Sequence, residues 1–215
     1  DPNTRDLPRN TPNPGEPSRA LIGDPRNDEN TIVSQLQATM LRFHNQVADV
    51  MASRLGRPPR FEDVQREVRW HYQWVVLHDF LPTIIGHDAV TAILPQIGTN
   101  EEGVSAFTPH LRFFHWKDQP YMPIEFSVAA YRFGHSMIRP IYRLNTQIDR
   151  LTIFPGQNGD PAGSLTGFRT LSADRAVDWT LFFPIEDRPS TGPTRVQPAY
   201  KIDTDRPNNL PTPDF

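Results

Sequence analysis

The clearest pattern in the chain is a stripe of apolar residues at helical spacing near its start. Between Glu29 and Leu55, apolar residues recur at steps of three and four, which places them on one face of a helix. They are Ile32, Leu36, Met40, Phe43, Val47 and Val50. Asp28 is suited to cap the first turn, and Gly56 ends the segment. The pattern predicts one long helix with a buried face.

Further helical segments follow in the central part of the chain. Bulky residues over 61–81 predict a second helix, which Pro82 closes. A short helix is expected within 87–98. Another begins at Pro123, a residue favoured at the first helical position, and runs to about Arg139. No series of β-hairpin patterns interrupts these segments, so the predicted fold class is mostly α.

The prolines gather at the two ends of the chain. Of 215 residues, 23 are proline, about twice the usual share of ~5%. Proline-rich flanks do not form helices or central strands. They are either disordered tails or extended arms lying on another surface, and their apolar content exceeds that of a typical disordered tail. We therefore divide the chain into an N-terminal arm (1–20), a helical body (21–187) and a C-terminal arm (188–215).

Charge and composition exclude several classes of function. The chain carries 22 basic and 25 acidic residues, a net charge of −3, which argues against a nucleic-acid binder steered by a basic field. Cysteine is absent, which rules out a disulfide scaffold, a thiolate nucleophile, a cysteine zinc site and a thiolate-ligated haem. No run of about 18 apolar residues occurs, so no transmembrane segment is predicted.

His135 is the first candidate for a functional residue. Helical spacing puts it on one stripe with Val128, Tyr131 and Ile138, so we expect its imidazole on the buried face. Gly134 precedes it, although a helix interior prefers alanine by ~1 kcal/mol. A glycine here would let a flat, wide group approach the backbone, and a buried neutral imidazole beside a gap suits an axial ligand of haem iron. Spacing alone favours the alternative, a core histidine held by one hydrogen bond.

Arg26 and Glu29 form the second candidate, at the start of the first predicted helix. Pro25 stiffens the chain there, and the helix N-terminus adds positive potential. A guanidinium held at this position would stabilise negative charge developing on a bound peroxide oxygen. Taken alone, the same residues are better explained as a capping region whose acidic side chains complement the helix dipole.

Several segments, in a fixed order, resemble a known family. Residues 21–30 (LIGDPRNDEN) and 40–45 (MLRFHN) are similar to the distal-arginine segment and first long helix of animal-type haem peroxidases, in their bacterial branch. Residues 125–138 (EFSVAAYRFGHSMI) resemble the family's proximal-histidine helix. Landmarks around 178–183 follow in the family's order. The resemblance covers about 20–205, and it implies a haem-peroxidase-type helical domain, incomplete in this chain, with long irregular proline-rich arms.

The resemblance implies a role for each matching residue. His135 matches the proximal ligand of the haem iron, and Arg26 matches the catalytic distal arginine. Glu29 matches the carboxylate that in some members forms an ester bond to a haem methyl. Arg132 is a weaker match, for contact with a haem propionate. The implied cofactor is haem b, and the implied reaction reduces hydrogen peroxide and oxidises a halide, a phenol or another small donor.

Some expected parts of the family's site are not found in this sequence. The family's distal histidine, calcium ligands and second ester-forming aspartate lie upstream of the arginine motif, but the 22 residues before Gly23 contain no histidine. The asparagine that accepts the proximal imidazole N–H would follow about where the chain stops, at 213–215. We therefore expect the central portion of a larger enzyme, either processed or assembled with other polypeptide segments. The body (21–187) would be the central part of the peroxidase domain, and calcium ligands would lie outside this chain.

Two other functions stay open at this point. One is a haem-dependent fatty-acid oxygenase of the same superfamily. The other is a haem-binding or interaction domain without turnover, because the distal base is missing. Glu29 favours the peroxidase, because an ester-linked haem suits a strong oxidant. The resemblance also implies a secreted or extracytoplasmic protein, with peroxide and a small-molecule donor as its partners and no nucleic acid.

Overall fold

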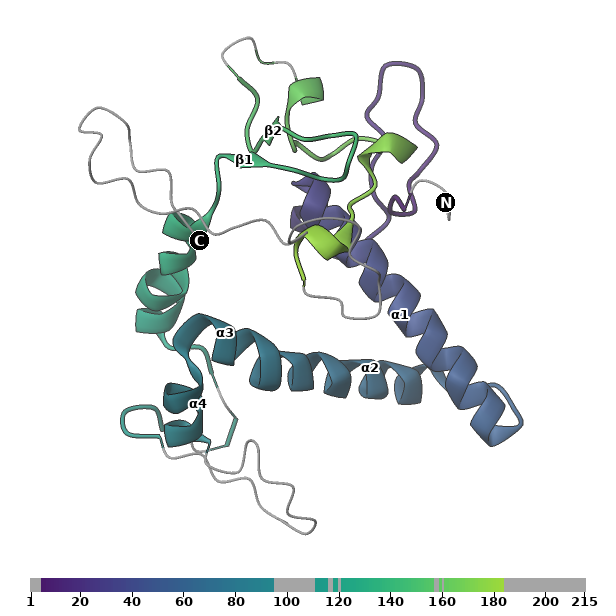
Figure 1. Cartoon of the computed structure of the whole chain (residues 1–215). Coiled ribbons are helices and arrows are strands. Elements are labelled where there is room, and N and C mark those ends of the chain that lie inside the picture. The colour runs from purple at the N-terminus through teal and green to yellow at the C-terminus, as the bar shows by residue number, and fades with distance from the viewer. Residues whose placement is uncertain are drawn as a thin grey trace, which may run out of the picture. The chain divides into compact units, whose positions relative to one another are not determined.

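The computed structural model describes most of the chain before residue 184 (Figure 1). The described residues are 5–94, 111–115, 118–119, 121–156, 159 and 161–183, without the side chains of Phe133, His135, Ser136 and Met137. They form two compact units, one from the described residues of Asp1–Leu41 and Tyr131–Phe215 and the other from those of Arg42–Ala130. The predicted C-terminal arm, 188–215, lies outside the described residues.

The first predicted helix is α1 (Thr31–Leu55), whose two ends lie in different units. It begins later than expected because Asn30 caps it. The Ile32 N–H donates to Asn30 Oδ1 at 2.9 Å, and the Ser34 N–H donates to the Asn30 carbonyl at 2.9 Å. The expected cap by Asp28 is therefore wrong. Gly56, with φ of +66°, ends the helix as predicted.

The buried face of α1 differs from the predicted one. Leu36 and Val50 are exposed, whereas the polar side chain of Gln35 is buried. Burial of Gln35 leaves no unsatisfied polar atom, because both the nitrogen and the oxygen of its amide form hydrogen bonds. Its Nε2 donates to the Arg175 carbonyl at 2.8 Å, and its Oε1 accepts from the Val177 N–H at 2.7 Å. Hydropathy spacing does not detect a polar side chain whose partners lie far along the sequence.

The second predicted helix runs past Pro82 to Gly86, where φ is +87°. Its parts are α2 (Phe61–Val75), a π-helical turn (Val76–Phe80) and α3 (Leu81–Ile85). The Leu81 N–H bonds the Val76 carbonyl, five residues back, so the turn before the proline is widened. Pro82 then occupies the first turn of α3, where its missing N–H costs little. The expectation that proline closes the helix is therefore wrong.

The two remaining predicted helices have mixed outcomes. The short helix expected within 87–98 is α4 (His87–Ile93). The segment expected to form an α-helix from Pro123 is instead a π-helical turn (Glu125–Ala129) followed by a 3₁₀ helix (Ala130–Met137). The α-helical period therefore does not apply to this segment.

The buried stripe predicted around His135 is not found. Val128 is 66% exposed and Tyr131 is 68% exposed, and Ile138 is exposed as well. Val128 lies in the π-helical turn, Tyr131 in the 3₁₀ helix and Ile138 beyond its end, so no single helical period relates the three side chains. The predicted burial is therefore wrong for these three residues.

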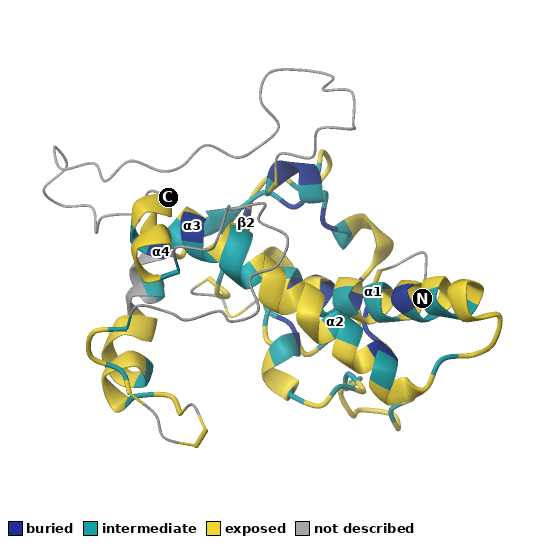
Figure 2. Ribbon diagram, turned by 90° about the horizontal axis from the view of Figure 1, so that it is seen from below, coloured by how far each residue is buried: buried dark blue, intermediate teal, exposed yellow. Residues whose placement is uncertain are grey.

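A small two-stranded sheet organises the unit that contains the start of α1. Strands β1 (Ile141–Tyr142) and β2 (Leu151–Thr152) are antiparallel, with Tyr142 opposite Leu151. The core beside them consists of Leu144, Leu151, Leu165 and Val177. Short 3₁₀ turns follow at Pro161–Gly163, Ala173–Arg175 and Trp179–Leu181. Figure 2 colours the buried positions dark blue and shows many exposed positions of α2 in yellow. The fold class is mostly α, as predicted.

The N-terminal arm packs against its own unit over residues 5–20. Leu7 is 3% exposed, and Arg9 and Ala20 form an antiparallel bridge. The Leu21 N–H donates to the Pro8 carbonyl at 2.7 Å. These contacts order the described residues of the segment, and its designation as an arm over 1–20 stays a prediction. In the part of the chain that the structure describes, no helix combines the length and apolar character needed to cross a membrane.

Candidate functional site

Arg26 lies in a short 3₁₀ turn, Pro25–Asp28, just before α1. Asp24 caps this turn by accepting the Arg26 backbone N–H at 3.0 Å. The same carboxylate binds the guanidinium of Arg26, with Nη2 to Oδ2 at 2.6 Å and Nε within 3.1 Å of both oxygens. The Arg26 side chain is 81% exposed. One carboxylate thus shapes the turn and orients the charged group.

Neighbouring groups change the pKa of Arg26. The hydrogen bonds that Arg26 donates to Asp24, and then the charge of Asp24, raise the pKa of Arg26 above its usual value, against a smaller lowering by desolvation. In return, the Arg26 hydrogen bonds lower the pKa of Asp24 from 3.8 to about 2.

Glu29 is exposed, but its backbone is held firmly by a distant segment. Its carbonyl accepts the Gly167 N–H at 2.9 Å, and the Asp28 carbonyl accepts the Phe168 N–H at 2.7 Å. A Cβ on Gly167 would lie 1.8 Å from the Asp28 carbonyl oxygen. Only glycine therefore permits this close approach of the two backbones. Sequence reasoning missed Gly167, because nothing in its local pattern marks a partner 138 residues away.

The turn of Arg26 is also held through its last residue, Asp28. The Asp28 carboxylate accepts two hydrogen bonds from Arg9, from Nη1 and from Nη2, each at 2.7 Å. Both side chains are buried, with 6% exposure for Arg9 and 3% for Asp28. Sequence reasoning assigned Arg9 to a proline-rich arm and gave it no role. Its apolar neighbours in the arm were the only signal that it might be enclosed.

His135 lies in the 3₁₀ helix Ala130–Met137, in the same compact unit as Arg26 and Glu29. Its side chain is outside the described residues, so its role as a ligand stays a prediction. Beside it, a Cβ on Gly134 would meet no described atom within 4 Å outside its own helix and chain neighbours. Arg132, on the same helix, is exposed.

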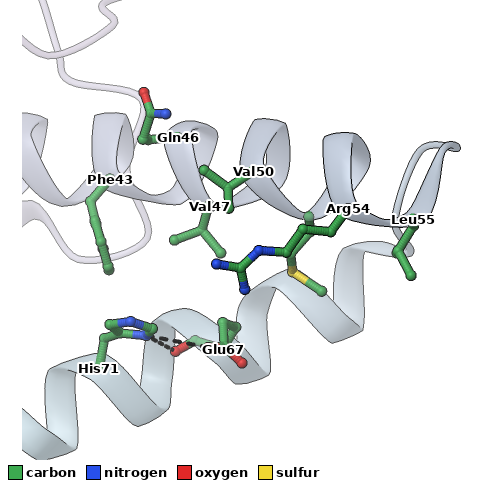
Figure 3. Close-up of a pocket in the computed structure, with 9 residues that line it drawn as sticks. Phe43, Gln46, Val47, Val50, Arg54, Leu55, Glu67 and His71 are labelled. Carbon is green, nitrogen blue, oxygen red and sulfur yellow. Dashed lines mark hydrogen bonds and ion pairs between the residues drawn. The ribbon is translucent and has the colours of Figure 1, made fainter.

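A separate groove lies between the C-terminal part of α1 and α2, within the other unit (Figure 3). Its volume is about 410 Å³. In the groove, His71 Nδ1 lies 2.9 Å from the Glu67 carbonyl oxygen, and the His71 ring meets Phe43 edge-on at 5.4 Å. None of the sequence-predicted site residues lines it.

Comparison with known proteins gives a consistent result. The family model described as animal haem peroxidase matches residues 2–158. Thyroid peroxidase of Mus musculus is 27% identical over 153 residues, which cover 67% of this chain and 15% of that protein. Chorion peroxidase of Aedes aegypti is 27% identical over 58% of this chain and 15% of its own length. Myeloperoxidase of Mus musculus is 25% identical over 59% of this chain and 16% of its own length.

The matched region is thus a small part of each relative. The chain spans about 15% of the length of the curated relatives it matches. No solved structure matches the chain.

Proposed function

The chain belongs to the animal haem peroxidase family, and from this we propose that it is part of a haem-dependent peroxidase. The enzyme would reduce hydrogen peroxide and oxidise a halide, a phenol or another small donor. One observation carries the proposal: the turn of Arg26 and residues 131–137 of the helix of His135 belong to one compact unit.

The residues of this unit suit a haem group. A Cβ on Gly134 would meet no described atom outside its own helix and chain neighbours, which leaves room among the described residues for a wide, flat ligand next to His135. Within the proposed site, His135 supplies an imidazole for the iron, and Arg132 supplies an exposed cation suited to a propionate. When bound, haem supplies the redox chemistry of peroxide reduction.

We assign Arg26 the role of stabilising negative charge on the substrate oxygen. Asp24 engages its Nε and Nη2, and within the described residues Nη1 has no hydrogen-bond partner. Nη1 can therefore donate a hydrogen bond to the negatively charged oxygen of a bound peroxide. A donor oriented before reaction loses little free energy to reorganisation as the charge develops. The guanidinium is cationic throughout the physiological pH range, as in any arginine.

We assign Glu29 to covalent attachment of the haem through an ester bond. Its side chain is exposed while its carbonyl is fixed by Gly167, so the carboxylate projects from a rigid backbone. Because the chain spans only 15% of thyroid peroxidase, we propose that other polypeptide segments supply the distal histidine, the acceptor for the His135 imidazole and any calcium ligands. The extracytoplasmic location remains a proposal based on the family resemblance.

Haem reconstitution followed by two assays tests this function. We expect a Soret band that elutes with the protein on gel filtration, and hydrogen peroxide-dependent oxidation of a chromogenic phenol. Oxygen uptake with linoleate would instead identify a fatty-acid oxygenase. A Soret band without either activity would identify a haem-binding domain, unless activity appears when the remaining segments are added. Absence of any Soret band would contradict the proposal.

A further inference from the structure

Arg9 is a buried cation that joins the N-terminal arm to the turn of Arg26. Besides its two bonds to Asp28, its Nε and Nη2 donate to the two carboxylate oxygens of Asp6, each at 2.9 Å. The Asp6 side chain is 5% exposed. One guanidinium therefore makes four charge-assisted hydrogen bonds to two enclosed carboxylates. Such bidentate pairs are geometrically restrictive, because the planar fork fits only one orientation of each partner.

Each carboxylate is in turn fixed to a different part of the unit. Asp6 Oδ2 accepts the Leu171 N–H at 3.0 Å, and its Oδ1 accepts the Leu7 N–H at 2.8 Å. Asp28 belongs to the turn itself, which is bonded to Phe168 through its carbonyl. Arg9 therefore links the turn to the segment around 165–171 through side chains as well as backbone.

The turn that Arg9 holds also carries the Asp24–Arg26 pair. Asp24 caps the turn at its start and Asp28 is its last residue, so each carboxylate fixes one end of it. The Asp28 carboxylate is buried against Arg9, and the partly exposed Asp24 binds Arg26 at the surface.

We infer that Arg9 is a positioning residue for Arg26: by occupying Asp28, it holds the turn and keeps the Arg26 guanidinium on Asp24, facing outward. Arg9 acts through Asp28 and takes no part in the reaction itself. The catalytic consequence rests on the proposed peroxidase function, but the positioning of Arg26 does not depend on haem.

The test compares three variants of the full chain without haem. Arg9→Gln removes the charge, Arg9→Lys keeps the charge without the planar fork, and Arg19→Gln is a control for loss of an exposed cation from the same arm. The first readout is the NMR titration of the Asp24 carboxyl, whose pKa is about 2 when Arg26 is bound to it. In Arg9→Gln we expect this midpoint to rise toward 3.8, because the turn that aligns Arg26 with Asp24 is no longer held at its Asp28 end. Arg9→Lys should give a smaller rise, and Arg19→Gln none.

Amide hydrogen exchange gives a second readout. In Arg9→Gln, residues 24–31 should exchange about tenfold faster or more, because an uncompensated buried carboxylate destabilises the turn. Residues 61–75, in the other unit, should be unchanged. In the haem-loaded protein, Arg9→Gln should lower kcat about tenfold while leaving KM for the phenol unchanged, which fits misplacement of one charged donor.

The outcomes separate this inference from the proposed function. If the Asp24 midpoint and the exchange of 24–31 in Arg9→Gln match those of the wild type, the inference is wrong. Should Arg9→Gln fail to fold, Arg9→Lys decides the question, and an unchanged Asp24 midpoint in that variant overturns the inference. If the protein binds no haem but the Asp24 midpoint shifts in Arg9→Gln, the positioning role of Arg9 is supported and only the peroxidase proposal is wrong.

Discussion

The carboxylate of Asp24 binds the guanidinium of Arg26, two residues later in the chain, with Nη2 and Oδ2 2.6 Å apart. The pair is largely exposed to solvent, so it adds little to the stability of the fold. Its effect is on orientation, because the same carboxylate also caps the turn that carries Arg26. Backbone and side chain of the proposed catalytic arginine are thus set by one neighbouring group.

Replacement of Arg26 should impair the reaction with peroxide but not the fold. We expect Arg26→Ala to slow this step by about 10²–10³-fold, the usual effect of losing one preorganised electrostatic donor. The thermal midpoint should stay within the range of surface substitutions, since the side chain is exposed. Stopped-flow absorbance of the haem-loaded protein measures the rate, with Arg19→Gln as the control. A rate equal to that of the wild type would remove Arg26 from the mechanism.

The Asp24–Arg26 pair should open only in strong acid. Arg26 lowers the pKa of Asp24 from 3.8 to about 2, so the pair is fully formed above pH 3.8 and is lost as the pH falls through about 2. NMR titration of the Asp24 carboxyl should give a midpoint near 2 in the wild type. In Arg26→Ala the midpoint should return toward 3.8. A wild-type midpoint of 3.8 would show that the two side chains do not pair in solution.

Gly167→Ala should destabilise the unit that holds Arg26. The added Cβ would lie 1.8 Å from the Asp28 carbonyl oxygen, so one of the two backbones must move. Forced displacement in a packed region typically costs about 1–3 kcal/mol in the free energy of unfolding. Gly163→Ala is the matched control, because a Cβ there meets nothing within 4 Å. Equal urea midpoints for the two variants would contradict the close approach.

Glu29→Gln should change how the haem is held. If Glu29 forms the ester, acid–acetone should leave haem on the wild-type protein after turnover with peroxide and extract it from Glu29→Gln. The substitution keeps the size of the exposed side chain, so folding should not change. Glu125→Gln, an exposed carboxylate elsewhere, is the control. Complete extraction of haem from the wild type would exclude the ester.

The features that could be predicted from the sequence are local ones. The C-terminus of α1 was predicted because Gly56 marks it directly. Arg26 and Glu29 were considered together because they are close in sequence, but the pairing of Arg26 with Asp24 was not predicted. The continuation of the helix through Pro82 was missed because it depends on a π-helical turn, whose hydrogen bonds leave no sequence pattern. The irregular helix around His135 was missed for the same reason.

The supports of the site could not be predicted in this way. Arg9 and Asp28 are 19 residues apart, and Gly167, whose backbone approaches that of Asp28, is 139 residues from it. Their association depends on tertiary packing that periodicity does not encode. The proposed site residues Arg26, Glu29, Arg132 and His135 came from the family resemblance, and their roles stay predictions.

The most direct test of the account is the optical spectrum of haem-reconstituted His135→Ala beside the wild type and His87→Ala. His87 is an exposed histidine on α4 and serves as the matched control. We predict a Soret band of equal intensity in the wild type and His87→Ala after gel filtration, and its loss in His135→Ala. Full haem occupancy in His135→Ala, with an unchanged band, would show that another residue binds the iron.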